Sequence, residues 1–398
     1  MKRSCFSFRM TSVCSALLML FMSACENPAS AQPLDDTADD PVVDAPAPVP
    51  PVKRSIKLAI LLDTSGSMNG LIEQAKSQLW NIVNELAKAE CDGLKPDLEI
   101  ALYQYGNDGL NAREGYIEMV TPLTTDLDQI SADLFKLTTN GGSEFCGQVI
   151  QTSLNQLAWA ESANDYKVIF IAGNEPFTQG DVSYATVCGD ARERGIIVNT
   201  IYCGDFSEGV RTQWKDGADI TLGKYMSIDH NSRTTFVSSP YDDKIATLNS
   251  QLNTTYVVYG DQGRDKMQLM EEQDANSRTY GQANAVKRAV SKSSHVYKSK
   301  DWDLVEAVAE NEVDLEAVSD DDLPAELKGK STAEVEAYVQ SKSEERTRIK
   351  NQIRELNQKR EAYVAAQRKE GTTPQLDDVI LSAIREQAKA QQFVFPAG

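Results

Sequence analysis

IKLAILLDTSGSM, residues 56–68, is the stretch that decides the fold class of this chain. Its first seven residues are almost continuously apolar, which is typical of a strand covered on both faces. Directly after it, Leu71, Ile72, Ala75 and Leu79 recur at helical spacing. A buried strand that leads through a short polar loop into an amphipathic helix predicts an α/β fold.

The same alternation continues to about Gly260. We expect further strands at Leu98–Tyr105, Tyr116–Val120, Lys167–Ile171, Ile196–Tyr202 and Thr234–Val237, and helices at Leu127–Leu137, Glu144–Ala160, Tyr184–Arg194 and Asp242–Leu252. Strands alternating with helices predict right-handed crossovers and a mostly parallel sheet between two helical layers, a Rossmann-like three-layer domain over residues 55–260. Ligands of such sheets bind beyond the carboxyl ends of the strands.

Residues 261–398 form a helical C-terminal region in this interpretation. Ser331 and Glu334 are spaced as in a capping box and predict the start of a helix of about 40 residues that ends near Gly371. Thr373-Pro374 predicts the start of a last helix. Heptad spacing in the long helix is brief, because Ser343, Arg346 and Arg360 fall near its expected seam. Helices that fold back on each other or on the α/β domain are therefore favoured over a sustained coiled coil.

The N-terminus resembles a bacterial lipoprotein signal. Residues 1–24 contain a basic start, an apolar stretch too short to span a bilayer, and small residues before Cys25. The resemblance implies cleavage before Cys25 and lipidation of its thiol, and an ordinary signal peptide is the alternative. Glu26 is not the aspartate that typically marks inner-membrane retention, which favours the outer membrane of a bacterial envelope, on either its periplasmic or its surface face.

A disordered tether is expected over residues 25–54, after the lipidated Cys25. Between Glu26 and Val52 lie seven of the chain's 14 prolines and six acidic residues, with no base. Proline removes backbone donors, like charges repel, and little apolar surface is present to bury. An extended segment of this kind would hold the folded domain away from a membrane.

The overall charge argues against a nucleic-acid partner. The 398 residues carry 40 Lys and Arg against 59 Asp and Glu, a net charge of −19, and show no basic stripe that would bind phosphates. The two histidines, His230 and His295, lie far apart in the sequence. A zinc site built on imidazole and a Ser-His-Asp triad are therefore disfavoured.

Four cysteines are left once Cys5 and Cys14 leave with the signal and Cys25 is lipidated. They are Cys91, Cys146, Cys188 and Cys203. An even number in an oxidising compartment predicts two disulfides, with three connectivities open. A Cys188–Cys203 bridge is favoured because an adjacent helix and strand can bring two cysteines close enough. Free buried thiols are the alternative.

The loop after the first strand carries the chemistry. Asp63, Ser65 and Ser67 form the pattern D-x-S-x-S at the carboxyl tip of that strand. One carboxylate and two hydroxyls are hard oxygen ligands, which suit Mg²⁺ or Mn²⁺ better than soft metals. The alternative is a polar turn whose serines cap the following helix.

The apolar strand, the DTSGSM loop and the following helix resemble the von Willebrand factor type A (vWA) domain, over about Ile56–Gly260. The resemblance implies a metal-ion-dependent adhesion site (MIDAS), in which Mg²⁺ binds an acidic group of a partner protein. Where the family has Gly-Gly-Thr, this chain has Gly141-Gly142-Ser143, and Ser143 keeps the hydroxyl. Where it has Thr-Asp-Gly, this chain places Gly173 at the aspartate position.

Loss of the carboxylate at Gly173 leaves two readings of the metal site open. Asn174 or Glu175 could supply oxygen directly or through water, with Asp205 acting from further out. Alternatively the site is degenerate and binds no metal, since affinity for such ions follows the number of charged ligands.

These observations predict a lipid-anchored, non-enzymatic protein that mediates adhesion or protein binding through the metal site. In the alternative, the protein is an envelope scaffold whose helical C-terminal region binds the partner, and the metal site is degenerate. A hydrolase that uses Asp63 or Glu175 is disfavoured, because the sequence has no recognisable pair of nucleophile and base.

Overall fold

The computed structural model describes residues 53–160, 162, 164–229, 237–367 and 376–395. The signal, Cys25, nearly all of the tether, His230, three of the four residues expected as a strand at Thr234–Val237, and the predicted helix boundaries at Gly371 and Thr373 lie outside the described residues. The described residues belong to one compact unit.

A six-stranded sheet lies at the centre, in the order β3-β2-β1-β4-β5-β6. The strands are β1 (Ser55–Asp63), β2 (Asp97–Tyr105), β3 (Ile117–Thr124), β4 (Tyr166–Gly173), β5 (Ile196–Tyr202) and β6 (Tyr225–Ser227). All neighbouring pairs are parallel except β2 and β3. The predicted, mostly parallel sheet is confirmed. Strand β6 was not predicted, because its three residues are too few to show a period.

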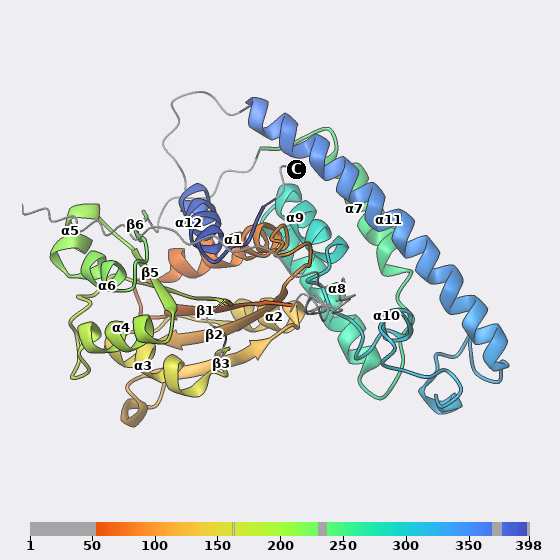
Figure 1. Cartoon of the computed structure of the whole chain (residues 1–398), viewed down its shortest axis with the longest axis horizontal. Coiled ribbons are helices and arrows are strands. Elements are labelled where there is room, and N and C mark those ends of the chain that lie inside the picture. The colour runs from red at the N-terminus through yellow and green to blue at the C-terminus, as the bar shows by residue number, and fades with distance from the viewer. Residues whose placement is uncertain (1–52, 161, 163, 230–236, 368–375, 396–398) are drawn as a thin grey trace, which may run out of the picture. The chain divides into compact units, whose positions relative to one another are not determined.

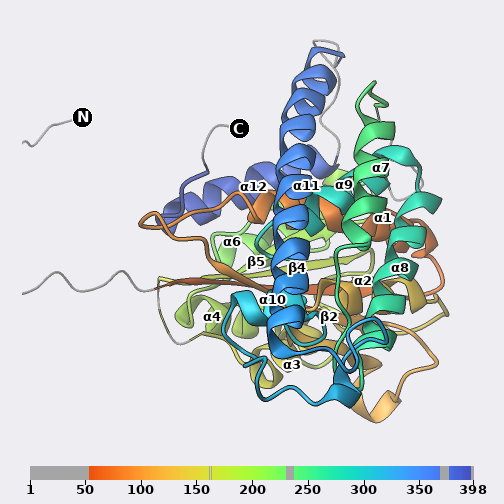
Figure 2. The ribbon, with the colours of Figure 1, turned by 90° about the vertical axis from the view of Figure 1, so that its right-hand side faces the viewer.

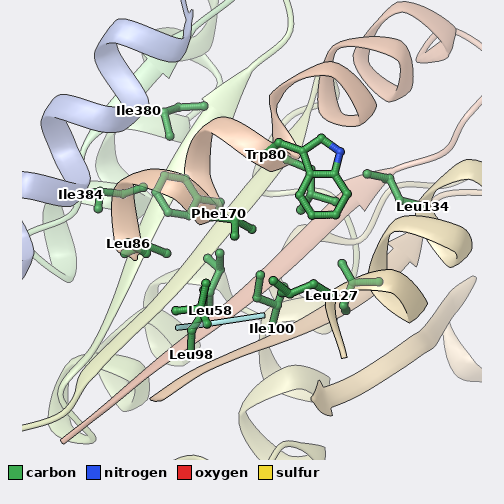
Figure 3. Close-up of a cluster of buried hydrophobic side chains, with 14 of the residues drawn as sticks. Leu58, Trp80, Leu86, Leu98, Ile100, Leu127, Leu134, Phe170, Ile380 and Ile384 are labelled. Atoms are coloured by element: carbon green, nitrogen blue, oxygen red, sulfur yellow. The ribbon is translucent and has the colours of Figure 1, made fainter. Parts of the chain in front are cut away.

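Helices cover both faces of this sheet, as Figure 1 shows. The helices within the sheet region are α1 (Asn69–Leu86), α2 (Leu127–Lys136), α3 (Cys146–Gln156), α4 (Tyr184–Glu193), α5 (Phe206–Arg211) and α6 (Trp214–Ile220), with a 3₁₀ turn, η1, at Ala112–Glu114. On β1, Ile56, Leu58 and Leu62 pack toward α1, whereas Ala59 and Leu61 pack toward α3. The alternation of a strand thus supplies two separate cores, and Figure 3 shows the first of them.

The remaining helices follow the sheet region. They are α7 (Asp242–Asn253), α8 (Gly263–Thr279), α9 (Gln282–Ser293), α10 (Leu304–Ala309), α11 (Thr332–Gln367) and α12 (Leu376–Ala390), with η2 at Asp320–Asp322. Helix α11 packs along α7 and α9 and over α10 (Figure 2). None of the described helices is both long and apolar enough to cross a bilayer.

The predicted start of α11 is confirmed in detail. The backbone N–H of Ser331 donates to the Glu334 carboxylate at 2.9 Å, and the backbone N–H of Glu334 donates to Ser331 Oγ at 3.4 Å. This reciprocal pair is the capping box that the sequence indicates.

Two arginines that interrupt the heptad pattern of α11 are buried anchors. Arg346 forms an ion pair with Asp303, and its Nη2 also donates to the Thr255 carbonyl at 2.6 Å. Arg360 Nε donates to Asp242 at 2.9 Å. A sustained coiled coil would have apolar residues at these positions. These two positions instead hold α11 against the rest of this chain, as the sequence favoured.

Helix α12 returns to the sheet and covers it beside α1. Ile380 and Ile384 are buried in the same core as Leu86 of α1 and Phe170 of β4 (Figure 3). Gln387 is also buried; its Nε2 donates to Asn199 of β5 at 2.7 Å, and its Oε1 accepts from the Tyr166 hydroxyl at 2.9 Å. The last described helix is therefore part of the central three-layer packing.

The predicted disulfides are absent, because all four described cysteines are free buried thiols. Cys91 and Cys203 belong to the core on the α1 side of the sheet, whereas Cys146 and Cys188 belong to the core on the α3 side. The favoured Cys188–Cys203 pairing is wrong because the two side chains lie on opposite faces of the sheet. Adjacency of a helix and a strand in sequence says nothing about which face the strand residue points to.

His295 predicts a measurable loss of stability in acid. Its Nε2 lies 3.1 Å from the Pro96 carbonyl, and burial lowers its pKa from 6.5 to about 4. Between these two values the unfolded chain binds a proton that the folded chain does not, so stability falls as the pH drops. After allowance for partial exposure we expect a loss of about 2 kcal/mol.

The measurement compares urea unfolding of wild type and His295→Gln at pH 7.5 and pH 4.5. The glutamine variant lacks this titration, so the difference between the two proteins should shrink as the pH falls. Parallel pH profiles for the two proteins would contradict the assignment.

Candidate metal centre

The D-x-S-x-S loop holds its first carboxylate in a fixed position. Asp63 is the last residue of β1 and is fully buried. The backbone N–H of Ser65 donates to Asp63 Oδ1 at 2.7 Å, while Oδ2 has no hydrogen-bond partner. The loop therefore turns back on the aspartate and leaves one of its oxygens for another group.

The two serines lie next to each other at the mouth of the loop. Ser65 Oγ is 3.4 Å from Ser67 Oγ, and Ser65 is buried whereas Ser67 is exposed. Neither caps the following helix, because the N-cap of α1 is Met68 and no side chain caps it. The alternative that the serines serve only as a cap is therefore wrong.

Residues after β4 reach the same place. Asn174 Nδ2 donates to Ser67 Oγ at 3.1 Å, and its Oδ1 is buried without a partner. Glu175 is half-buried, and its carbonyl accepts a bond of 2.8 Å from Trp214 Nε1. Of the predicted oxygen donors, Asn174 thus adjoins the serines directly, and Glu175 lies close enough for its charge to act on Glu144, the residue described next.

Glu144, which sequence reasoning missed, lies beside Asp63. It is buried, and one of its carboxylate oxygens has no hydrogen-bond partner. The predicted ligand Ser143 is its half-buried neighbour in the same loop, and no hydrogen bond of the Ser143 side chain is found within the described part of the chain. The signal in the sequence was an acidic residue directly after Gly141-Gly142-Ser143 and before a helix.

The two carboxyl groups lie close enough to affect each other's ionisation. Burial, together with the adjacent Glu144 carboxyl group and its negative charge, raises the pKa of Asp63 from 3.8 to about 9. Burial also raises the pKa of Glu144, although Asp63 and the Ser65 hydroxyl stabilise its charged form. Two adjacent buried carboxylates disfavour each other's ionisation, and a positive charge between them would favour the ionised form of both.

The donor set fits a hard divalent cation. Asp63, Glu144 and Asn174 each have an unpaired buried oxygen, and Asn174 contacts Ser67, whose hydroxyl adjoins that of Ser65. In the described ranges no group of three or more His, Cys, Asp or Glu side chains is arranged to hold a metal ion, so hydroxyl and amide oxygens would have to complete the donor set. Carboxylate, amide and hydroxyl oxygens are the ligands that Mg²⁺ and Mn²⁺ prefer.

Asp205 does not take part, contrary to its suggested supporting role. It caps α5, where its carboxylate accepts from the backbone N–H groups of Ser207 at 2.9 Å and Glu208 at 3.1 Å. Such short-range capping is common for aspartate after a strand.

A hollow of about 550 Å³ opens beside the site. It shares Asn174 and Glu175 with the site and extends to Tyr202 and Arg211. Phe177, Tyr202 and Trp214 pack against one another beneath it, with ring centroids 4.8 and 5.8 Å from the Trp214 ring. Because these rings are packed together, the hollow is a preformed surface next to the candidate oxygen ligands.

Comparison with known proteins agrees with this geometry. Residues 57–248 match the family model of the von Willebrand factor type A domain. The chain thus contains a vWA domain, and a helical region follows it. No curated protein matches the sequence.

Among solved structures, the conserved hypothetical protein BatB from Bacteroides thetaiotaomicron is 15% identical, with a TM-score of 0.34 over 45% of this chain and 92% of that chain. The SpRpn10 VWA domain is 15% identical, with a TM-score of 0.33 over 44% and 88%. Proximal thread matrix protein 1 from the mussel byssus, solved with a zinc-occupied MIDAS motif, is 13% identical, with a TM-score of 0.34 over 45% and 43%.

Proposed function

We propose that this chain is a non-enzymatic binding protein that recognises an acidic group of a partner protein through a divalent cation. Asp63, Ser65 and Ser67 would hold the cation, with Asn174 beside them. The observation that carries the proposal is the set of buried, unpaired oxygens around two serine hydroxyls at the carboxyl ends of β1 and β4. Mg²⁺ or Mn²⁺ suits this donor set.

The residues of the loop suit such a role. Ser65 N–H fixes one oxygen of Asp63, so the other oxygen is presented without further rearrangement. Ser67 is exposed, so the donor set reaches the surface. A bound divalent ion with an open coordination position supplies a local positive charge on an otherwise acidic protein. A carboxylate of a partner is the natural ligand for that position.

The partner would rest on the surface around the site. The hollow lined by Tyr202 and Arg211 adjoins the proposed oxygen ligands of the cation. Phe206 on the neighbouring helix α5 is 53% exposed. An exposed aromatic residue near a polar hollow is typical of protein-binding surfaces. We propose binding rather than catalysis because the one described histidine, His295, contacts Pro96 at the opposite end of β2.

We also propose that the domain acts at a bacterial cell envelope, held to the membrane by a lipid on Cys25. The support is the sequence alone, where an apolar stretch and Ser23-Ala24-Cys25 precede the proline-rich segment.

Asp63→Ala tests the metal claim. Since a ligand that binds only the folded state stabilises it, Mg²⁺ at 100 times its dissociation constant should add about 2.7 kcal/mol to wild type and nothing to the variant. Thermal unfolding in MgCl₂ and in EDTA measures this difference. Asp205→Ala is the matched control and should keep the wild-type response, because Asp205 caps α5. Equal midpoints with and without Mg²⁺ in wild type would refute cation binding.

Peptide selection tests the partner claim. Displayed random peptides are retained on wild-type protein in MgCl₂ and in EDTA, and those retained only with Mg²⁺ should be enriched in Asp and Glu. Retention that is independent of Mg²⁺, or lacks acidic residues, would contradict recognition through a cation.

A further inference from the structure

We infer that Glu144 is the second acidic ligand of the cation site and replaces the carboxylate that is missing at Gly173. The inference rests on the proposed function, since it assigns a residue of this chain to the same cation. With Glu144 the site has two protein carboxylates in place of one. The second carboxylate favours a site that binds the cation over a degenerate site that does not.

The first support is burial without a partner. Asp63 is 0% exposed and Glu144 is 4% exposed, and each has an unpaired carboxylate oxygen. Burying an ionisable group without a partner costs several kcal/mol, so such groups are rare unless something joins them. A cation between the two carboxylates would satisfy both oxygens at once.

The second support is that both carboxylates pack against one glycine. A Cβ atom at Gly106 would lie 2.7 Å from Glu144 Cγ and 3.0 Å from Asp63 Oδ1. Gly106 also has a φ of 78°, which disfavours other residues. The backbone N–H of Glu144 donates to Gln179 Oε1 at 2.6 Å, which fixes the loop that carries the glutamate. Both carboxyl side chains therefore fit only because position 106 is a glycine.

The third support is that position 173 has no room for a carboxylate. A Cβ atom at Gly173 would lie 2.6 Å from the Tyr105 hydroxyl and 3.2 Å from Asp63 Oδ2. Tyr105 cannot move away easily, because it is fully buried and donates to the Ala172 carbonyl at 2.9 Å. Tyr105 therefore fills the space where an aspartate side chain would begin, and Glu144 approaches Asp63 from a different loop.

A shared proton is the other way to join the two carboxyl groups, and it belongs to the metal-free protein. A proton and a divalent cation would occupy the same gap, so each would exclude the other. The two cases differ in what happens when Glu144 loses its charge but keeps its shape.

Glu144→Gln separates these cases, with Glu193→Gln, at an exposed position on α4, as the matched control. Calorimetric titration with MgCl₂ and MnCl₂ should show at least a tenfold loss of affinity for Glu144→Gln, because affinity follows ligand charge. Glu193→Gln should stay within about threefold of wild type, because it removes one exposed charge outside the donor set. Glu144→Asp, which keeps the charge on a shorter side chain, should bind more tightly than Glu144→Gln.

Thermal unfolding in EDTA provides the second measurement. Without metal, Glu144→Gln should be at least as stable as wild type, because it removes one of two buried carboxyl groups. Loss of affinity with unchanged metal-free stability thus supports ligation over a structural role.

Each result bears on the inference. Wild-type affinity in Glu144→Gln overturns it, as does a metal-free midpoint that falls in step with affinity. No binding of either ion by wild type overturns the inference together with the proposed function. Binding of the ion that depends on Glu144, without Mg²⁺-dependent retention of acidic peptides, supports the inference and refutes only the proposed function.

Discussion

A chain that ends at Gln367, and so lacks α12, is expected to lose its cooperative unfolding transition. Ile380, Ile384 and Phe393 are each at most 4% exposed and pack in the core over the α1 side of the sheet. Burial of a large apolar side chain contributes about 1.5–3 kcal/mol, so three of them approach the whole stability of a typical domain. Phe170 of β4 would become exposed with them.

Polar contacts add to this loss. Asn199 is fully buried, and both atoms of its side-chain amide exchange hydrogen bonds with Gln387 of α12. Without α12 the Asn199 Nδ2 donor would have no partner among its present contacts, which costs about 1–3 kcal/mol if water does not reach it. The vWA family model ends at residue 248, but the packing of this chain requires a helix more than one hundred residues further on.

Circular dichroism and thermal unfolding of the truncated chain measure this prediction. If the truncated chain cannot be purified, two point variants test the contribution of the C-terminal segment to stability. Ile384→Ala should cost about 2–5 kcal/mol, because it opens a cavity in a packed core. Val394→Ala, at a side chain that is 56% exposed, should cost about 0.5 kcal/mol or less. A truncated chain with the full-length midpoint would show that the sheet does not need α12.

The elements nearest the D-x-S-x-S loop were predictable because their signals are local. Strand β1, the D-x-S-x-S loop and helix α1 follow one another in sequence, and a buried strand followed by a helical period needs no distant partner to be recognised. The capping box of α11 is local in the same sense. Strand β6 has too few residues to show a period, so it was missed.

The parts that failed depend on contacts between distant segments. Nothing in the spacing of the α12 residues says that they cover β4 and β5. Cys188 and Cys203 lie near each other in sequence, but the sheet separates their side chains. Glu144 was overlooked because the family pattern drew attention to Ser143. Its place beside Asp63 becomes visible only in the fold, where both side chains pack against Gly106.

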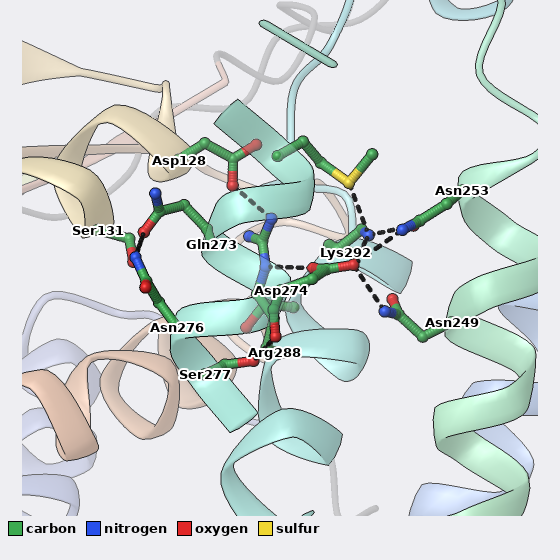
Figure 4. A network of polar contacts seen from close by, with 12 residues as sticks. Asp128, Ser131, Asn249, Asn253, Gln273, Asp274, Asn276, Ser277, Arg288 and Lys292 are labelled. Atoms are coloured by element: carbon green, nitrogen blue, oxygen red, sulfur yellow. Dashed lines mark hydrogen bonds and ion pairs between the residues drawn. The ribbon is translucent and has the colours of Figure 1, made fainter. Parts of the chain in front are cut away.

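Asp274→Ala is expected to cost about 3–5 kcal/mol, because it removes the carboxylate that pairs with the buried Lys292 and one of the two that pair with the buried Arg288. Figure 4 shows Asp274 of α8 at the centre of a polar network. Its carboxylate accepts from Arg288 Nε at 3.1 Å and from Lys292 Nζ at 2.9 Å, and both cationic side chains are 0% exposed. Asn249 and Asn253 of α7 donate to the same carboxylate at 2.8 and 2.9 Å.

This network joins the helical region to the sheet region. Arg288 of α9 also pairs with Asp128 of α2, and its guanidinium lies 4.6 Å from the centroid of the Trp80 ring of α1. Although burial opposes ionisation, the charges of Lys292 and Arg288 hold the pKa of Asp274 well below its ordinary value. The carboxylate is therefore charged at neutral pH, and its removal directly affects the contacts of α8 with α7 and α9.

Urea unfolding of Asp274→Ala and of the double variant Asp274→Ala/Lys292→Met measures the contribution of the network. Lys292→Met removes the buried ammonium group that has lost its carboxylate, and it keeps most of the side-chain volume. The double variant should therefore recover at least 1 kcal/mol of the lost free energy of unfolding. Asp219→Ala breaks an exposed ion pair with Lys215 and should cost about 0.5 kcal/mol or less. If Asp274→Ala lowers the free energy of unfolding by no more than Asp219→Ala does, packing alone holds α8 and α9 in place. If the double variant is less stable than the single variant, Lys292 stabilises these helices through contacts other than Asp274. One such contact is the bond of 3.0 Å from Lys292 Nζ to the Met270 sulfur.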